Sequence, residues 1–321
     1  MPLDSKKSKA TERLLIFGGF PKGVKTELLD LDDPGFKCNL ADFPDQRLFM
    51  QGALIKKNES GHTKVLACGG FSKKSKRFTR DCFDFENNKW ASSFNLKYPR
   101  FHYGQGSIVH DNKVLILGKD FTHLQQTSKS SSWMGLDGIS RGPTLPAAIE
   151  GFCQVQLNST HALLAGGLNR YKPDDKSYFW NLVSGDFELG PKLNAKKSVN
   201  FGCAKTQIGG KEVVFLLGGM KRKEKSDLAV EFLDLTDLGK GWQKSVDIPD
   251  GSDGNIVEVS GKLYSIGNKL GPDKIYQLHC EKNVLSTAGC LFKEIATKLK
   301  YKRRNFLAIP VPASFAKHNC K

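Results

Sequence analysis

The sequence lacks the features by which most enzymes and membrane proteins are identified. No apolar run approaches the roughly 20 residues that a membrane-spanning helix needs. No GxSxG, P-loop, HExxH or dinucleotide-binding motif occurs. We therefore expect a binding protein rather than an enzyme, with no cofactor and no bound metal.

Cysteine is sparse, with eight residues in a chain of 321, which is too few for a small disulfide-rich scaffold. No CxxC pair occurs and the histidines do not cluster with the cysteines, so there is no zinc-binding pattern. Two pairs could form bridges: Cys68 with Cys82 on neighbouring strands, and Cys280 with Cys290 across a hairpin. The sequence favours free buried thiols and leaves both bridges open.

The N-terminal stretch 1–13 contains lysines but lacks the apolar run, roughly 7–15 residues long, of a signal peptide. This predicts a cytoplasmic protein, although the mature form of a secreted protein would look the same. We expect residues 1–12 to form a flexible basic arm and residues 313–321 to form a C-terminal tail.

Positive charge is in large excess, with 49 Lys and Arg against 33 Asp and Glu and a net charge of +16. Such an excess favours acidic partners, namely nucleic acid, an anionic membrane surface or an acidic protein. The alternative is that lysine-rich loops serve only to keep the domain soluble.

A short apolar run that ends in glycine recurs along the whole chain. Its six copies are 14–19, 65–70, 114–119, 162–167, 213–219 and 263–268. The copies follow one another at intervals of 48 to 52 residues, and a fixed period of this size indicates repeated supersecondary units. Six such units, each rich in short strands, predict an all-β fold, a six-bladed β-propeller over residues 13–312.

The second unit carries the most complete set of marks. It has Gly69-Gly70, then Phe83-Asp84, Trp90 seven residues after that aromatic, Pro99-Arg100 and Gly104. The glycines let the backbone leave the inner strands where a Cβ would collide with a neighbour, and the aromatics can pack between blades. This unit resembles a kelch repeat, and eroded copies of it cover residues 13–312. The resemblance implies a kelch-type propeller, a fold that commonly serves as a protein-interaction scaffold.

The two ends of the chain predict how the ring closes. Residues 303–312 resemble the strand that precedes the glycine-ending run in the other units, and the first unit lacks that strand. We expect them to pair with residues 14–17 as the innermost strand of the first blade, which would remove free sheet edges.

The corners that lead into the innermost strands define a predicted rim at the axial mouth. The equivalent positions are Phe49, His102, Ile149, Asn200, Ser252 and Phe306. In kelch adaptors this part of the surface binds peptide, whereas the alternative is that these residues only plug the channel. An enzymatic or small-molecule site at this mouth also stays open. His102 would be its only group that titrates near neutral pH.

Basic loops follow several of the glycine pairs and should lie on the same face as the rim. The candidate binding residues are Lys73, Lys74, Lys76, Arg77, Arg170, Lys172, Lys221, Arg222, Lys223 and Lys225. Such runs are often no more than solvated loop tips.

The partner that we expect on this basic face is an acidic protein or peptide. An actin-like cytoskeletal protein is one example, because kelch propellers include proteins that bind actin filaments. Nucleic acid is a weaker alternative, since few aromatics interleave with the charges and lysine outweighs arginine. The oligomeric state stays open.

Overall fold

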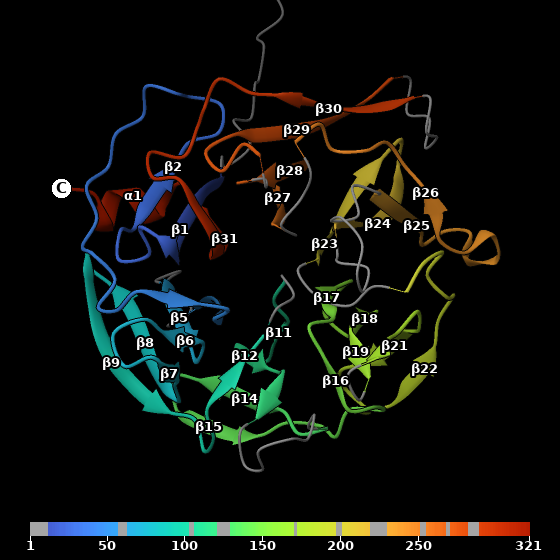
Figure 1. Cartoon of the computed structure of the whole chain (residues 1–321), viewed down its shortest axis with the longest axis horizontal. Helices are drawn as coiled ribbons and strands as arrows, with labels where there is room; N and C mark the ends of the chain where they lie inside the picture. The colour runs from blue at the N-terminus through green and yellow to red at the C-terminus, as the bar shows by residue number, and fades with distance from the viewer. Residues whose placement is uncertain are drawn as a thin grey trace, which may run out of the picture.

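The structure is a computed structural model that describes residues 12–56, 63–102, 106–120, 129–169, 172–196, 201–218, 230–250, 255–267, 270–281 and 289–321. The expected N-terminal arm, except for Glu12, lies outside this range. Almost all described elements are strands, with one short helix, α1 (Ser314–Asn319), and one 3-10 turn (Leu238–Lys240). Six antiparallel sheets surround a central axis (Figure 1). The predicted six-bladed β-propeller is confirmed.

The blades follow one another in chain order around the ring, and the strands of each blade are named from the axis outward. Blade one consists of β31 (Arg303–Pro312), β1 (Glu12–Pro21) and β2 (Glu27–Leu29). Blade two consists of β4 (Gln51–Lys56), β5 (Thr63–Cys68), β8 (Asp81–Glu86) and β9 (Lys89–Asn95). Blade three consists of β11 (Val109–His110), β12 (Lys113–Ile116), β14 (Ser132–Gly135) and β15 (Gly138–Arg141).

The remaining three blades repeat the four-stranded pattern. Blade four consists of β17 (Cys153–Gln156), β18 (His161–Ala165), β21 (Ser177–Asn181) and β22 (Phe187–Leu189). Blade five consists of β23 (Phe201–Ile208), β24 (Lys211–Gly218), β25 (Val230–Asp234) and β26 (Gln243–Lys244). Blade six consists of β27 (Ile256–Val259), β28 (Lys262–Ile266), β29 (Ile275–Cys280) and β30 (Cys290–Glu294).

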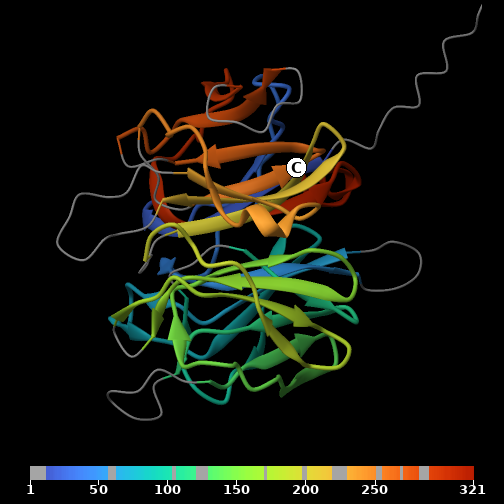
Figure 2. The same ribbon diagram turned by 90° about the vertical axis from the view of Figure 1, so that its right-hand side faces the viewer.

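Strand β31 closes the ring, as predicted from the sequence. It runs antiparallel to β1, with Leu307 opposite Phe17 and Ile309 opposite Leu15, and the two lie on the same side of the ring in both views (Figures 1 and 2). Leu307 and Ile309 pack in the cluster shared with blade two, whereas Phe306 packs in the cluster shared with blade six. Because blades stack face to face, a strand buries both of its faces, which explains its continuous apolar run.

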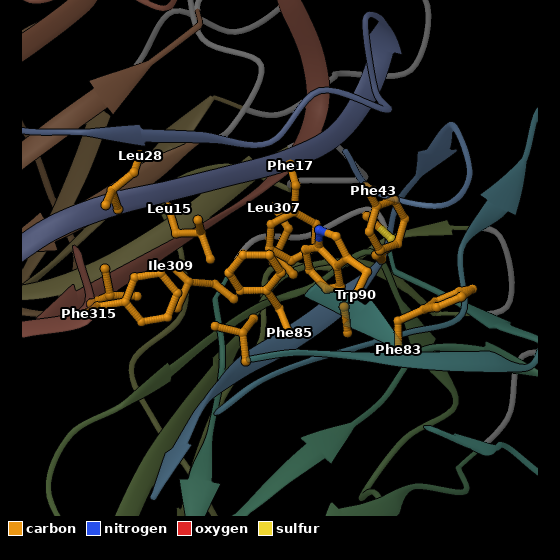
Figure 3. Packing of buried hydrophobic residues seen from close by; sticks show 14 residues of the cluster. Leu15, Phe17, Leu28, Phe43, Phe83, Phe85, Trp90, Leu307, Ile309 and Phe315 are labelled. Carbon is orange, nitrogen blue, oxygen red and sulfur yellow. The ribbon is translucent and has the colours of Figure 1, made fainter. Parts of the chain in front are cut away.

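The chain end after β31 packs against blade two. Phe315 of α1 is only 2% exposed and its ring stacks on Phe85, with centroids 6.0 Å apart (Figure 3). The Asn319 carboxamide oxygen accepts a hydrogen bond from the backbone N–H of Asn88 at 2.8 Å. Residues 313–321 are thus part of the packed structure.

All eight cysteines lie in pairs, so the expectation of free thiols is wrong. The pairs are Cys38–Cys320, Cys68–Cys82, Cys153–Cys203 and Cys280–Cys290. Both bridges that the sequence left open are formed. The other two join residues 282 and 50 positions apart, and no local spacing reveals such pairs.

Buried arginines hydrogen-bond to the backbone at the corners between blades. Arg303 is fully buried and donates to the carbonyls of Gly18 at 3.2 Å and Lys25 at 2.6 Å and to the Glu27 carboxylate at 2.6 Å. Burial raises the pKa of Glu27, and the guanidinium opposes this shift. Two further arginines repeat the arrangement. Arg47 donates to the carbonyls of Gly69 and Asp81 and to the Asp81 carboxylate. Arg100 donates to the carbonyls of Gly118 and Ser130 and to the Ser130 hydroxyl.

Removal of the closing strand should abolish cooperative folding. Truncation after Lys302 removes β31 and exposes the apolar edge of β1, so we expect aggregation or loss of a single melting transition. Truncation after Ala313 removes α1, Cys320 and Lys321 and should lower the melting temperature while keeping one transition. Calorimetry on both truncated proteins checks this. If the shorter protein melts like the full chain, the closure is wrong.

Replacement of Arg303 should destabilise the protein strongly. Arg303→Met leaves the buried Glu27 carboxylate with the Lys300 N–H but without its ion-pair partner, and we expect the free energy of unfolding to fall by about 3–5 kcal/mol. Addition of Glu27→Gln should recover part of the loss. The exposed neighbour Lys302 is the matched control, and Lys302→Met should change stability by less than about 0.5 kcal/mol. Urea titration measures all three, and equal stability of the two single variants would contradict the role of Arg303.

Candidate functional site

One face of the ring carries both the corners and the loops that follow the glycines. Three small sheets show this: β3 (Arg47–Leu48) pairs with β6 (Phe71–Ser72) and β7 (Arg77–Phe78), β10 (Arg100–Phe101) pairs with β13 (Lys119–Asp120), and β16 (Ile149–Glu150) pairs with β19 (Leu168–Asn169) and β20 (Lys172–Pro173). In blades two to four the corner therefore lies beside the loop after the next glycine. We call this surface the loop face.

The structure places the described rim residues at different depths. Phe49 is partly exposed, its N–H donates to the Asn305 carbonyl at 3.5 Å, and its own carbonyl accepts from the His102 N–H at 3.1 Å. His102 and Phe306 are each only 2% exposed, so their side chains lie beneath the rim. Asn200 and Ser252 lie outside the described residues. The binding role of the rim remains a prediction.

The side chain of His102 is packed in the core. Its ring meets Phe152 edge-on, with centroids 4.8 Å apart, and neither ring nitrogen has a hydrogen-bond partner in the described part of the chain. Burial lowers the pKa of His102 to about 4, with a smaller opposing effect of the Phe152 backbone. The ring is therefore neutral at pH 7 and attracts no anion there.

The hairpin between β6 and β7 presents the predicted basic residues of blade two. Lys73, Lys74, Lys76 and Arg77 are all exposed, and among the residues that the structure describes none of them forms an ion pair with a carboxylate. Lys172, at the start of β20, is exposed as well. The other predicted residues, Arg170, Lys221, Arg222, Lys223 and Lys225, lie outside the described residues. The described charges thus gather mainly on blade two.

An exposed aromatic that the sequence reasoning missed lies next to this hairpin. Phe20, at the end of β1, is 50% exposed, and the Lys73 ammonium lies 4.8 Å from the centre of its ring. Phe20 also pairs with the exposed Arg304 across the β1–β31 seam, and Lys22 follows it on the surface. We call Phe20, Lys22, Lys73 and Arg304 the seam patch. The sequence feature that could have revealed Phe20 is its position directly after a glycine pair, which Phe71 shares.

A pocket of about 880 Å³ lies on the other side of the same hairpin. Its basic lining residues are Lys74, Arg77, Arg80 and Lys97, and the latter two were not among the predicted residues. Its acidic lining residues are Asp45 and Asp81. Arg47 already holds both carboxylates, at 3.0 and 2.8 Å. The uncompensated charge of this blade-two pocket is therefore positive.

The axis of the ring holds a second, smaller cavity of about 380 Å³. Residues on or beside the innermost strands of all six blades line it, including Leu54, Ser107, Gln156, Lys205, Glu258 and Ala308. Within the described ranges no group of three or more His, Cys, Asp or Glu could hold a metal ion. A search of the same residues finds no helix that is long and apolar enough to cross a membrane.

Comparison with known proteins identifies distant relatives. No family model matches the chain. Kelch repeat-containing protein kel-10 of Caenorhabditis elegans is 28% identical over 112 residues, and Kelch repeat and BTB domain-containing protein F47D12.7 of the same organism is 30% identical over 113 residues. Each match covers 33% of this chain and only 18% of the relative's own length.

A solved structure extends the comparison to most of the fold. The structure titled "Structure of YjhT" superposes with a TM-score of 0.64 at 13% sequence identity, covering 84% of this chain and 91% of that one. At this identity the likeness concerns the fold alone. The matched stretch makes about a third of the chain a distant homologue of kelch repeat-containing proteins, and the solved structure supports the propeller fold over most of the rest.

Proposed function

We propose that the chain is a protein-interaction scaffold that holds an acidic protein or peptide on its loop face. The kelch-repeat relatives support an interaction role in general terms. The observation that carries the acidic partner is the exposed hairpin 73–77, whose four cations form no ion pair with a carboxylate of the described residues. One of them, Lys73, lies 4.8 Å from the ring centre of the half-exposed Phe20. The contact surface in this proposal is the hairpin, the blade-two pocket and the seam patch.

The combination of unpaired cations and one exposed aromatic suits a protein partner. Cations without internal partners exchange water for a ligand carboxylate without breaking an ion pair of the protein, and they accelerate association with an acidic surface. Large aromatic rings and arginine are enriched in interface hot spots, and the seam patch contains one of each. We therefore expect the partner to present several carboxylates next to an apolar side chain.

The same geometry ranks the partner classes. An acidic peptide segment or an acidic filament surface, such as that of an actin-like protein, meets both requirements. Nucleic acid is the weaker candidate, because single strands are bound by several aromatics on which successive bases stack, and Phe20 is the one ring of the contact surface that is half exposed in the described residues.

Charge reversal on the hairpin tests the proposal. The probe is a fluorescent peptide of alternating Glu and Leu, and binding is measured by anisotropy. We expect Lys74→Glu/Arg77→Glu to weaken the affinity at least tenfold, which is about 1.4 kcal/mol, and Phe20→Ala to weaken it several-fold. Binding to the unaltered chain should also weaken between 0.15 and 0.5 M salt, since salt screens exposed charges.

The matched control changes the net charge equally at the other ends of the blade-two strands. Lys56, paired with Thr63, and Lys89, paired with Glu86, are both exposed and lie at the ends of their strands away from the glycines. Lys56→Glu/Lys89→Glu should leave the affinity within about twofold of the unaltered chain. An equal loss in both double variants would assign the binding to net charge alone, and no binding by the unaltered chain would reject the proposal.

A small-molecule site at the axial mouth is the second candidate, supported by the 380 Å³ cavity. His102 is the residue on which this candidate depended. A site that used its ring for acid–base chemistry would need the ring to be accessible and to titrate near neutral pH.

The pH dependence of stability distinguishes a buried from an accessible His102. Its folded pKa of about 4 lies below the usual 6.5, so the unfolded chain binds the extra proton. His102 thus favours the folded state above pH 6.5, and this contribution is lost as the pH falls towards 4, by roughly 3 kcal/mol in total. We expect His102→Leu to show a flatter acid limb in urea titrations from pH 7 to 4. Parallel curves for the two proteins would show a ring that titrates normally, which would favour the axial site.

A further inference from the structure

The four cysteine pairs lie at four separate places and follow two different patterns. Cys68–Cys82 and Cys280–Cys290 each join adjacent strands of one blade, as the strand registers show. Cys153–Cys203 joins the innermost strands of blades four and five, with Cα atoms 5.6 Å apart. The fourth pair, Cys38–Cys320, joins the loop after β2 to the chain end after α1, with Cα atoms 5.0 Å apart.

No cysteine of the chain is left without a partner. Cysteines that serve only as small buried apolar residues have no reason to occur in bonding pairs, since any buried position would serve equally. Here Cys38–Cys320 and Cys153–Cys203 have Cα atoms 5.0 and 5.6 Å apart, within the usual range for a bridge. The other two pairs lie directly opposite each other on adjacent strands, with Cα atoms 4.1 and 3.9 Å apart. Cytosolic thiols are kept reduced, whereas such bridges form and persist in the secretory pathway and outside the cell.

We infer that the chain folds and functions in an oxidising compartment, where the Cys38–Cys320 disulfide closes the ring covalently. For each bridge the two thiols lose two electrons and two protons, and one sulfur–sulfur bond forms. The acceptor is the disulfide of a thiol–disulfide oxidoreductase, which takes up both electrons and both protons and leaves as a dithiol. This assignment to the secretory lumen or the outside of the cell differs from the cytoplasmic location expected from the N-terminal stretch.

The surroundings of Cys38–Cys320 support its role as a covalent link that closes the ring, which we call the clasp. Asn88, in the β8–β9 turn of blade two, accepts from the Ala41 N–H at 2.7 Å through its carboxamide and donates its own N–H to Asn319 at 2.8 Å. One turn of blade two thereby holds the segments that carry Cys38 and Cys320. The clasp spans 282 residues, so it encloses almost the whole propeller.

An oxidising compartment restricts the class of partner that the chain can meet, a step that rests on the proposed function. An acidic partner of the loop face would have to reside in the secretory lumen or outside the cell. An actin-like filament of the cytosol is then excluded, and the remaining class is an acidic extracellular or luminal protein.

Thiol counting on the protein from its native tissue tests the inference. The tissue is lysed in denaturant with N-ethylmaleimide, and the intact mass of the full chain is measured. The protein is then reduced, treated with N-ethylmaleimide again, and its mass is measured a second time. We expect no adduct before reduction and eight afterwards, and peptide mapping should recover the 38–320 cross-link. Maleimide adducts on the cysteines of the unreduced protein would overturn the inference.

Paired serine variants test the clasp, with the protein secreted from eukaryotic cells behind an added signal peptide. Cys38→Ser/Cys320→Ser opens the longest loop, and we expect its melting temperature to fall by roughly 5–10 °C. Cys280→Ser/Cys290→Ser opens a loop of ten residues, and its melting temperature should fall by roughly half as much. A larger fall for the short-loop pair would reject the ring-closing role of Cys38–Cys320.

Anisotropy with the Glu–Leu peptide on the same secreted samples separates the two proposals. A fully bridged chain that fails to bind the peptide contradicts the proposed function and leaves the bridges intact. A chain from native tissue that binds the peptide but carries free thiols contradicts the oxidising compartment alone.

Discussion

The pairing of β31 with β1 is the contact on which the rest of the propeller depends. Alternate residues of this one strand enter two different interblade clusters, Phe306 with blade six and Leu307 and Ile309 with blade two. Without β31, blade one would keep only two of its strands, and both neighbouring blades would face solvent where they now pack. Since each blade is stable only between its neighbours, the loss of one interface spreads around the ring.

The positive charges of the chain perform two physically distinct tasks. The buried arginines are Arg47, Arg100 and Arg303. Their guanidinium N–H groups donate hydrogen bonds to backbone carbonyls and nearby side chains under the corners. These arginines hold the loop face in place and are unavailable to a partner. The lysines of the 73–77 hairpin are exposed and form no ion pair within the described part of the chain, so in the proposed function they are the charges that an acidic ligand would meet. A net charge alone does not distinguish the two groups, whereas burial does.

The sequence predicted the features that local patterns encode. The period of about 50 residues, the glycine pairs and the unmatched strand at residues 303–312 were sufficient for the six blades and their closure. Contacts between blades follow no such pattern, because they join residues about one repeat apart or at opposite ends of the chain, as in Cys153–Cys203 and Cys38–Cys320. His102 was assigned to the rim by its position in the repeat. The sequence could not show that its side chain turns under the rim towards Phe152, because orientation at a corner depends on the neighbouring blade.

The seam patch connects ring closure with ligand binding. Phe20 belongs to β1, Arg304 to β31 and Lys73 to blade two, so the patch exists only while the two ends of the chain are paired. A ligand that binds this patch binds the closed ring and not the open one. By mass action such a ligand stabilises closure, and by the same linkage any clasp that favours closure raises the fraction of chains able to bind. A disulfide between residues 38 and 320 would therefore act on affinity without touching the ligand, since it removes the open state from which the patch is absent.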